Sequence, residues 1–277
     1  MTLRLALLGC GIGRSLSPVL HQAAGLSLGR AVDFRLFDFQ AQLDPSGLAD
    51  ALSLFFKADG PIASLDGFSV TAPLKQLVMP QMHHLSAPAT RLGAVNAVSI
   101  RAGRRLGHNT DLEGFNLALG PLPIGRAVVL GAGGAARAVV AVLADRGALV
   151  HVVNRDEQKA QDLLAALTSD RGTYHRWDDC RRAFEEADLV VQCGSGGPAI
   201  LRPENLPFGV CRRSARAFDL NYRPRVTPFL KAAASFGLGT LSGLDMLIYQ
   251  GVAAFEGFSG ERPELEAVRS AVYAALD

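Results

Sequence analysis

Two short segments of the chain carry side chains able to move a proton. One is Ser69–Lys75, and the other is Gly107–Phe115, which contains Asp111. Turn-forming residues and hydroxyl or amide side chains surround both groups, as expected for loops. A Gly-rich turn typical of dinucleotide binding begins twenty residues after Asp111. A lysine and an aspartate beside a nicotinamide suit reversible carbonyl reduction, because hydride delivery builds negative charge on an oxygen that needs a proton donor.

Each of these groups also has a simpler interpretation. Lys75 alone would be a solvated surface lysine, and Asp111 could cap a helix that begins near Glu113. The two segments together favour a proton-transfer couple. The remaining candidate bases are expected to be packing or surface residues: His21, His83, His84 and His108.

Composition narrows the class of protein. A chain of 277 residues with 49% hydrophobic residues predicts two domains of an α/β protein. The net charge of +2, without a basic run interleaved with aromatics, argues against nucleic acid as a partner. No stretch approaches the roughly 20 apolar residues of a membrane span. Four scattered cysteines predict a reduced cytoplasmic protein without a metal site. The sequence leaves a monomer and a homodimer equally open.

The elements that must position these groups can be predicted from hydrophobic patterning. In the first part we expect strands at 3–8, 34–39, 67–70 and 95–100, and helices from Ser17 and over 48–58. Ser17 is the expected N-cap, with Pro18 at the first helical position. After a linker at 120–123, a βαβ alternation predicts strands at 127–130, 149–153, 189–193 and 217–220. The last forty residues are helical in pattern, and we expect them to pack on the first domain.

The motif Gly131-x-Gly133-x-x-Ala136 follows a strand and opens a helix, which is the context of a Rossmann dinucleotide site. Glycine allows the backbone to approach a pyrophosphate, and the helix N-terminus supplies unpaired N–H donors. A Gly-rich turn that binds nothing is the alternative.

The end of the next strand bears on the choice of cofactor. Asn154 stands where an NAD site usually has an acidic residue, and Arg155 could pair with a 2′-phosphate. Asp156 argues the other way, because a carboxylate repels a phosphate. The residues therefore favour NADP, with NAD possible, and an ordinary solvated Arg155 is the alternative.

With these residues in view, the chain resembles the shikimate dehydrogenase family over essentially its full length. The matching segments are Ser15-Leu16-Ser17-Pro18-x-x-His21, Val70-Thr71-x-Pro73-x-Lys75, Gly93-Ala94-Val95-Asn96, Asn109-Thr110-Asp111-x-x-Gly114-Phe115, Gly131-Ala132-Gly133-Gly134-Ala135, Asn154-Arg155-x-x-x-Lys159-Ala160, Asp219-Leu220-x-Tyr222-x-Pro224 and Gly243-x-x-Met246-Leu247-x-x-Gln250.

The resemblance implies interconversion of 3-dehydroshikimate and shikimate, or of the quinate pair, in aromatic amino acid biosynthesis. It implies a substrate domain at 1–111, completed by helices at 243–277, and a Rossmann-type domain at 112–242. Lys75 and Asp111 would be catalytic. Substrate would be bound by Ser15, Ser17, Thr71, Asn96, Asp111, Tyr222 and Gln250. The cofactor would be bound by Gly131, Ala132, Gly133, Gly134, Ala135, Asn154, Arg155, Gly243 and Met246.

The chain departs from the family pattern at several places. Ser69 replaces the usual Asn, Asp156 replaces Thr or Ser, and the loop at 192–197 replaces the usual Asn-Ala-Thr segment. The opening Gly9–Ser15 is closer to quinate/shikimate or shikimate dehydrogenase-like paralogues. Such a paralogue, and a regulator that binds metabolite or cofactor without turnover, are therefore the alternatives to a shikimate dehydrogenase.

Overall fold

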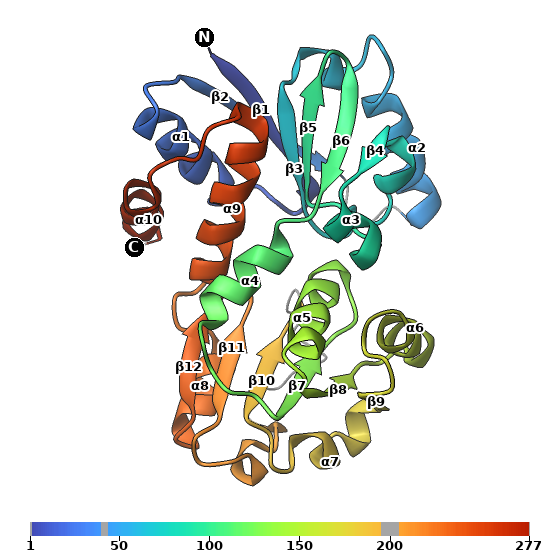
Figure 1. The fold of residues 1–277 in the computed structure, drawn as a ribbon, viewed down its shortest axis with the longest axis vertical. Coiled ribbons are helices and arrows are strands. Elements are labelled where there is room, and N and C mark those ends of the chain that lie inside the picture. Colours follow the sequence, from blue (N-terminus) through green and yellow to red (C-terminus); the bar gives the residue numbers. More distant parts are fainter. Residues whose placement is uncertain (1, 40–43, 195–204, 277) are drawn as a thin grey trace. The chain divides into compact units, whose positions relative to one another are not determined.

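The chain forms two compact units (Figure 1). The computed structural model describes residues 2–39, 44–194 and 205–276. Unit 1 comprises Met1–Gly114 and Ile248–Asp277, and unit 2 comprises Phe115–Leu247. The chain passes between the units within helix α4 (Asp111–Leu119) and again within helix α9 (Gly243–Ser259).

Unit 1 is built on a mixed sheet whose described strands follow the order β2-β1-β3-β5-β6-β4. Its strands are β1 (Leu3–Cys10), β2 (Val32–Phe39), β3 (Gly67–Val70), β4 (His84–Leu85), β5 (Ala97–Arg101) and β6 (Arg104–His108). Strand β1 pairs in parallel with both β2 and β3, and β5 runs antiparallel to β3 and β6. The middle of β1 is buried without interruption, as expected for a central strand covered on both faces.

Helices cover this sheet and complete unit 1. They are α1 (Ser17–Ser27), α2 (Pro45–Phe55), α3 (Ala87–Leu92), the part of α9 from Ile248 on, and α10 (Leu265–Ala274), with 3-10 turns at Pro61–Ser64 and Met79–Gln81. Helix α10 lies against α1 (Figure 1). Phe55, Phe56 and Phe68 form the aromatic part of a core between α2 and the sheet.

Unit 2 has a fully parallel sheet, ordered β12-β11-β10-β7-β8-β9 within the described residues. The strands are β7 (Arg126–Leu130), β8 (Leu149–Val153), β9 (Gly172–His175), β10 (Leu189–Gln192), β11 (Arg216–Asp219) and β12 (Gly239–Ser242). The helices are α5 (Gly134–Asp145), α6 (Glu157–Leu167), α7 (Arg181–Phe184) and α8 (Pro228–Ser235), with 3-10 turns at Trp177–Asp179 and Phe208–Val210. Read from β9, this is the Rossmann order 3-2-1-4-5-6, and the predicted α/β class is confirmed.

The structure corrects the predicted start of α1. Leu16, rather than Ser17, occupies the N-cap position, and its side chain makes no capping hydrogen bond. The N–H of Ser17 instead donates to Oγ of Ser15 at 3.1 Å, so that a hydroxyl two residues upstream satisfies this helix terminus. Pro18 lies in the first turn, as predicted. No helix in the described part of the chain is both long and apolar enough to cross a membrane.

Candidate active site

Lys75 lies on the loop that follows strand β3 in unit 1. The loop is held at both ends, because the N–H of Thr71 donates to the Leu8 carbonyl at 2.8 Å and the N–H of Val95 donates to the Lys75 carbonyl at 2.8 Å. Leu74 is completely buried and anchors the loop between these points. The Lys75 side chain is only 12% exposed, and its Nζ lies 2.5 Å from Oδ2 of Asp111. The two segments singled out in the sequence therefore meet.

Asp111 stands at the start of α4 and is buried, with 6% of its side chain exposed. Its second oxygen, Oδ1, accepts a hydrogen bond from Nδ2 of Asn96 at 2.8 Å. Its backbone N–H donates to Oδ1 of Asn109 at 3.1 Å. Both carboxylate oxygens are thus engaged by side chains, Lys75 on one side and Asn96 on the other. This geometry favours the proton-transfer couple over a helix-capping role for Asp111.

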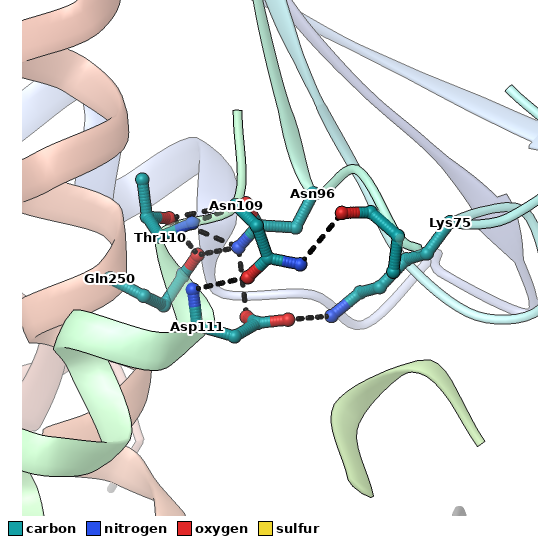
Figure 2. A network of polar contacts seen from close by, with 7 residues as sticks. Lys75, Asn96, Asn109, Thr110, Asp111 and Gln250 are labelled. Atoms are coloured by element: carbon teal, nitrogen blue, oxygen red, sulfur yellow. Dashed lines mark hydrogen bonds and ion pairs between the residues drawn. The ribbon is translucent and has the colours of Figure 1, made fainter. Parts of the chain in front are cut away.

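Asn96 is the centre of the polar network drawn in Figure 2. Its Oδ1 accepts from the N–H of Thr110 at 2.8 Å, and its Nδ2 lies 3.2 Å from Oε1 of Gln250. Gln250 comes from α9, far along the chain, and Thr110 Oγ1 lies 3.4 Å from the same Oε1 atom. The side-chain amide oxygens of Asn96 and Gln250 both have hydrogen-bond partners, which fixes the orientation of the two amides. Gln250 therefore belongs to this network and is not an isolated residue on a helix surface.

A nearly buried lysine and aspartate of this kind hold a charged donor in one place. Removing charges from water is costly unless they are paired and hydrogen-bonded, and here Asn96 and Lys75 supply the partners of Asp111. The ammonium of Lys75 carries three protons and engages Asp111 with one of them. The arrangement can deliver a proton to an oxygen and stabilise negative charge that develops there.

Ser15, Ser17 and Thr71 lie around the end of β1. Oγ of Ser15 donates to Oγ of Ser17 at 3.1 Å, which brings the two hydroxyls together. A side chain at Gly9 would have its Cβ 2.4 Å from Cγ2 of Thr71, so only glycine allows Thr71 to lie against this strand. Hydroxyls so arranged can bind carboxylate or alcohol groups.

The Gly-rich turn lies at the switch point of the unit 2 sheet, between β7 and β10. Gly131 has a φ of +106°, a conformation that favours glycine, and Gly133 is the N-cap of α5. A Cβ on Gly131 would lie 3.4 Å from the backbone nitrogen of Gly194. Gly131, Ala132, Gly133, Gly134 and Ala135 thus form the turn and helix start that suit a pyrophosphate.

The end of β8 holds the residues expected to select the cofactor. Asn154 is tied to its own loop, because its Nδ2 donates to the Asp156 carbonyl at 2.7 Å. Asp156 is the N-cap of α6 and accepts from the Lys159 N–H at 3.1 Å. That hydrogen bond, together with the Lys159 ammonium, lowers the pKa of Asp156. Arg155 is exposed and has no ionic partner among the described residues.

Three further predicted residues belong to unit 2 and not to the network around Lys75. Tyr222 lies on the loop after β11 and is half-buried. Gly243 begins α9, where a Cβ would lie 2.2 Å from the Leu220 carbonyl oxygen, and Met246 is buried in the same helix. No group of three His, Cys, Asp or Glu residues in the described ranges is arranged to hold a metal ion.

Several polar residues at these sites were given no catalytic or binding role from the sequence. Asn109 hydrogen-bonds Asp111, and Thr110 hydrogen-bonds Asn96. Their position next to Asp111 in the sequence could have indicated this supporting role. Gln192 accepts from the Gly194 N–H at 2.9 Å, and Nδ2 of Asn221 donates to the Gly194 carbonyl at 2.9 Å. These bonds fix the first part of the unusual loop at 192–197, whereas 195–197 lie outside the described residues.

Comparison with known proteins gives the family. A two-unit α/β architecture with a Rossmann sheet and a dinucleotide turn is typical of nicotinamide-dependent oxidoreductases. The model of the shikimate dehydrogenase substrate binding domain matches residues 7–98, that of shikimate/quinate 5-dehydrogenase matches 118–235, and that of the shikimate 5′-dehydrogenase C-terminal domain matches 243–273. The chain belongs to the shikimate dehydrogenase family.

Individual relatives span nearly the whole chain. Shikimate dehydrogenase (NADP(+)) of Desulfitobacterium hafniense is 35% identical, covering 100% of this chain and 99% of the relative. The solved structure of shikimate 5-dehydrogenase from Thermus thermophilus, in complex with NADP(H) and shikimate, gives a TM-score of 0.82 at 34% identity and covers 99% of this chain and 100% of the other. Quinate dehydrogenase from Corynebacterium glutamicum, in complex with NAD, gives 0.80 at 31% identity and covers 99% of each chain.

Proposed function

We propose that the chain is an NADP-dependent shikimate dehydrogenase that reversibly reduces 3-dehydroshikimate to shikimate. The observation that carries this proposal is the contact of 2.5 Å between Nζ of Lys75 and Oδ2 of Asp111, in a chain of this family. The dinucleotide, when bound, supplies or accepts a hydride. The protein must then supply the matching proton and hold the substrate.

Lys75 is the proposed proton donor in the direction of reduction. Its ammonium stabilises the alkoxide that forms as hydride reaches the ketone carbon, and one of its protons passes to that oxygen. Asp111 holds the ammonium in position, and Asn96 holds Asp111. In the direction of oxidation the same lysine, as the neutral amine, takes the proton from the substrate hydroxyl.

The remaining polar groups of unit 1 fit a substrate with one carboxylate and several hydroxyls. Ser15 and Ser17 are proposed to bind the carboxylate. Thr71, Asn96 and Gln250 offer neutral hydroxyl and amide groups that can donate to or accept from alcohols, and Asp111 can accept. Tyr222 is also proposed to bind the substrate. The substrate class is therefore a polyhydroxy carboxylate, the chemistry that shikimate and quinate share.

NADP is the proposed cofactor, with its pyrophosphate at Gly131–Ala135. Asn154 and Arg155 are proposed to bind the adenosine ribose, with the exposed Arg155 guanidinium on the 2′-phosphate. Asp156 repels the 2′-phosphate less than its charge suggests, because its carboxylate already binds the N–H and the ammonium of Lys159. Gly243 and Met246 are proposed to complete the site.

The part of the chain proposed to bind the substrate is 1–111 together with 243–277, and the part proposed to bind the dinucleotide is 112–242. We propose a cytoplasmic enzyme, monomeric or homodimeric, that acts on a small molecule and has no nucleic-acid or membrane partner. A preference for quinate is a second candidate, favoured by the likeness to quinate dehydrogenase from Corynebacterium glutamicum.

One experiment separates these functions. Steady-state oxidation of shikimate and quinate is measured with NADP and with NAD, for the wild type, Lys75→Ala and the control Lys57→Ala, which changes an exposed lysine. We expect shikimate with NADP to be preferred and Lys75→Ala to lose ~10²–10⁴-fold in rate. Equal turnover by wild type and Lys75→Ala would refute the mechanism. Substrate binding that raises the melting temperature without turnover in any combination would indicate a non-catalytic regulator.

A further inference from the structure

The loop between β1 and α1 is anchored by two buried side chains, Ile12 and Leu16, but its glycines make no packing contacts. It begins with Gly11, whose φ is +67°, and a Cβ added at Gly11 or at Gly13 would meet nothing within 4 Å. Yet this loop leads to Ser15 and Ser17, the hydroxyls proposed to bind the substrate carboxylate. The backbone at these two glycines has many conformations to lose on binding, so a contact that fixes it prearranges the loop.

Asp38, on the neighbouring strand β2, provides that support. In the sheet it stands opposite Gly9, the residue two before Gly11. Its Oδ1 accepts from the N–H of Gly11 at 2.7 Å, and its Oδ2 accepts from the N–H of Ile12 at 3.0 Å. Two successive backbone N–H groups form a small anion-binding concavity, and here a carboxylate of the protein itself fills it.

A continuous chain of hydrogen bonds leads from this point to the serines. The N–H of Ser15 donates to the Ile12 carbonyl at 2.9 Å, and the N–H of Ser17 donates to Oγ of Ser15 at 3.1 Å. The two hydroxyls then meet at 3.1 Å. The position of Ile12 thus sets the position of Ser15, and that of Ser15 sets Ser17.

We propose that Asp38 is a positioning residue that prearranges Ser15 and Ser17 for the carboxylate of the substrate. This inference rests on the proposed function, because it assumes that the two serines bind that group. Asp38 does not touch the substrate. It occupies the N–H groups of Gly11 and Ile12, so the substrate carboxylate is bound by hydroxyls further along the loop.

The charges of the loop agree with an anionic ligand. The negative charge of Asp38 is met by two backbone N–H groups of the loop. Arg14, directly before Ser15, is exposed and has no ionic partner within the described residues. A positive charge is therefore left beside the serines, and it attracts a carboxylate.

The test compares shikimate with its methyl ester, which keeps the hydroxyls but lacks the negative charge. The variants are Asp38→Ala and Asp38→Asn, with Asp33→Ala as control, because Asp33 lies on the same strand and pairs with Arg35. For Asp38→Ala we expect KM for shikimate to rise about tenfold, with kcat within about twofold, since the loss of a positioning contact is worth roughly one factor of ten. KM for the ester and for NADP should change less than twofold, and Asp38→Asn should lie between the wild type and Asp38→Ala.

Equal losses on shikimate and on its ester would overturn the proposal while leaving the function intact, because they would show general damage to the unit. An unchanged KM for shikimate in both folded Asp38 variants would overturn it as well. If Asp38→Ala does not fold, as judged by circular dichroism, Asp38→Asn decides the matter by the same acid-to-ester comparison. A wild type that oxidises neither compound would refute the proposed function itself, and this inference with it.

Discussion

Nδ2 of Asn96 lies 2.8 Å from Oδ1 of Asp111, the carboxylate oxygen that Lys75 does not contact. Asp111 is therefore held from two sides. The direction of the Lys75 ammonium depends on an amide that carries no charge and takes no proton. Asn96 is itself fixed by the Thr110 N–H, so the geometry of Lys75 and Asp111 depends on the backbone of unit 1.

Replacing Asn96 should weaken both catalysis and folding. In Asn96→Ala, Oδ1 of Asp111 loses its partner in a buried site, which costs about 1–3 kcal/mol of unfolding free energy. We expect kcat/KM for shikimate to fall roughly 10–100-fold, because a misplaced donor loses part of its orientation advantage. Urea denaturation and steady-state kinetics measure the two effects. The control is Gln22→Ala, which removes an exposed amide, and wild-type activity in Asn96→Ala would argue against a supporting role.

Asp111→Asn tests the charge of the couple while nearly preserving its shape. The amide leaves the Lys75 ammonium without its counter-ion and turns an NH₂ group toward one of two donors, Lys75 or Asn96. We expect kcat to fall ~10²-fold or more and the solvent deuterium isotope effect to rise, because proton transfer becomes slower relative to the other steps. A merely structural Asp111 would lower stability and leave the isotope effect unchanged. Comparison of kcat in H₂O and D₂O distinguishes the two cases.

Arg155→Ala should alter the choice of cofactor and little else. If its guanidinium binds the 2′-phosphate, kcat/KM for NADP falls ~10–100-fold, since a charge-assisted contact is worth about 1.5–3 kcal/mol. The value for NAD, which lacks this phosphate, should stay within about twofold. Asp156→Thr should shift the ratio toward NADP, and threonine can still cap α6. An NADP to NAD ratio that neither substitution moves would rule out this assignment.

His21 should make the stability of unit 1 depend on pH. It is buried and stacked on Phe34, with ring centroids 5.0 Å apart, and burial lowers its pKa to about 3. The unfolded chain has a histidine pKa of about 6.5 and therefore binds a proton between pH 6.5 and 3 that the folded chain does not. The contribution of neutral His21 to the free energy of unfolding is complete above pH 6.5. It is lost as the pH falls toward 3, and about 2 kcal/mol of it is gone at pH 5.

Urea denaturation followed by circular dichroism at pH 8 and pH 5 measures this loss. His21→Phe replaces the ring by one that does not titrate, and we expect its stability to change less between the two values than that of the wild type. The difference between the proteins isolates His21 from His151, whose burial also lowers its pKa, to about 4. Parallel pH profiles for the two proteins would contradict the assignment.

The regular elements of the fold were predictable where the apolar pattern was long. The residue pattern of Arg126–Asp145 predicts strand β7, the glycine turn and helix α5. The alternation of strands and helices around this segment predicts the α/β class. Strands β9 and β12 were missed, because four residues with partly exposed, polar positions give no clear period of two. The N-cap of α1 was displaced by one residue, since the Ser15 hydroxyl does what a capping Ser17 was expected to do.

The site could be predicted where motifs are local and not where contacts join distant segments. Lys75 and Asp111 stood out by their neighbours in the sequence, and the structure brings their side chains together. Asp38 gave no signal, because its partner Gly11 is 27 residues away and its strand has an ordinary pattern. The capping role of Asp156 was likewise overlooked in favour of its charge alone.

The discontinuity of unit 1 has a consequence for its synthesis. Gln250 of the polar network and Phe255 beside His21 both follow the whole of unit 2 in the chain. While a ribosome translates Phe115–Leu247, the earlier part of unit 1 exists without these partners, and domains generally fold in the order in which they emerge. The network around Asn96 can close only after Gln250 has been made, so this site forms after the whole of unit 2 has been translated.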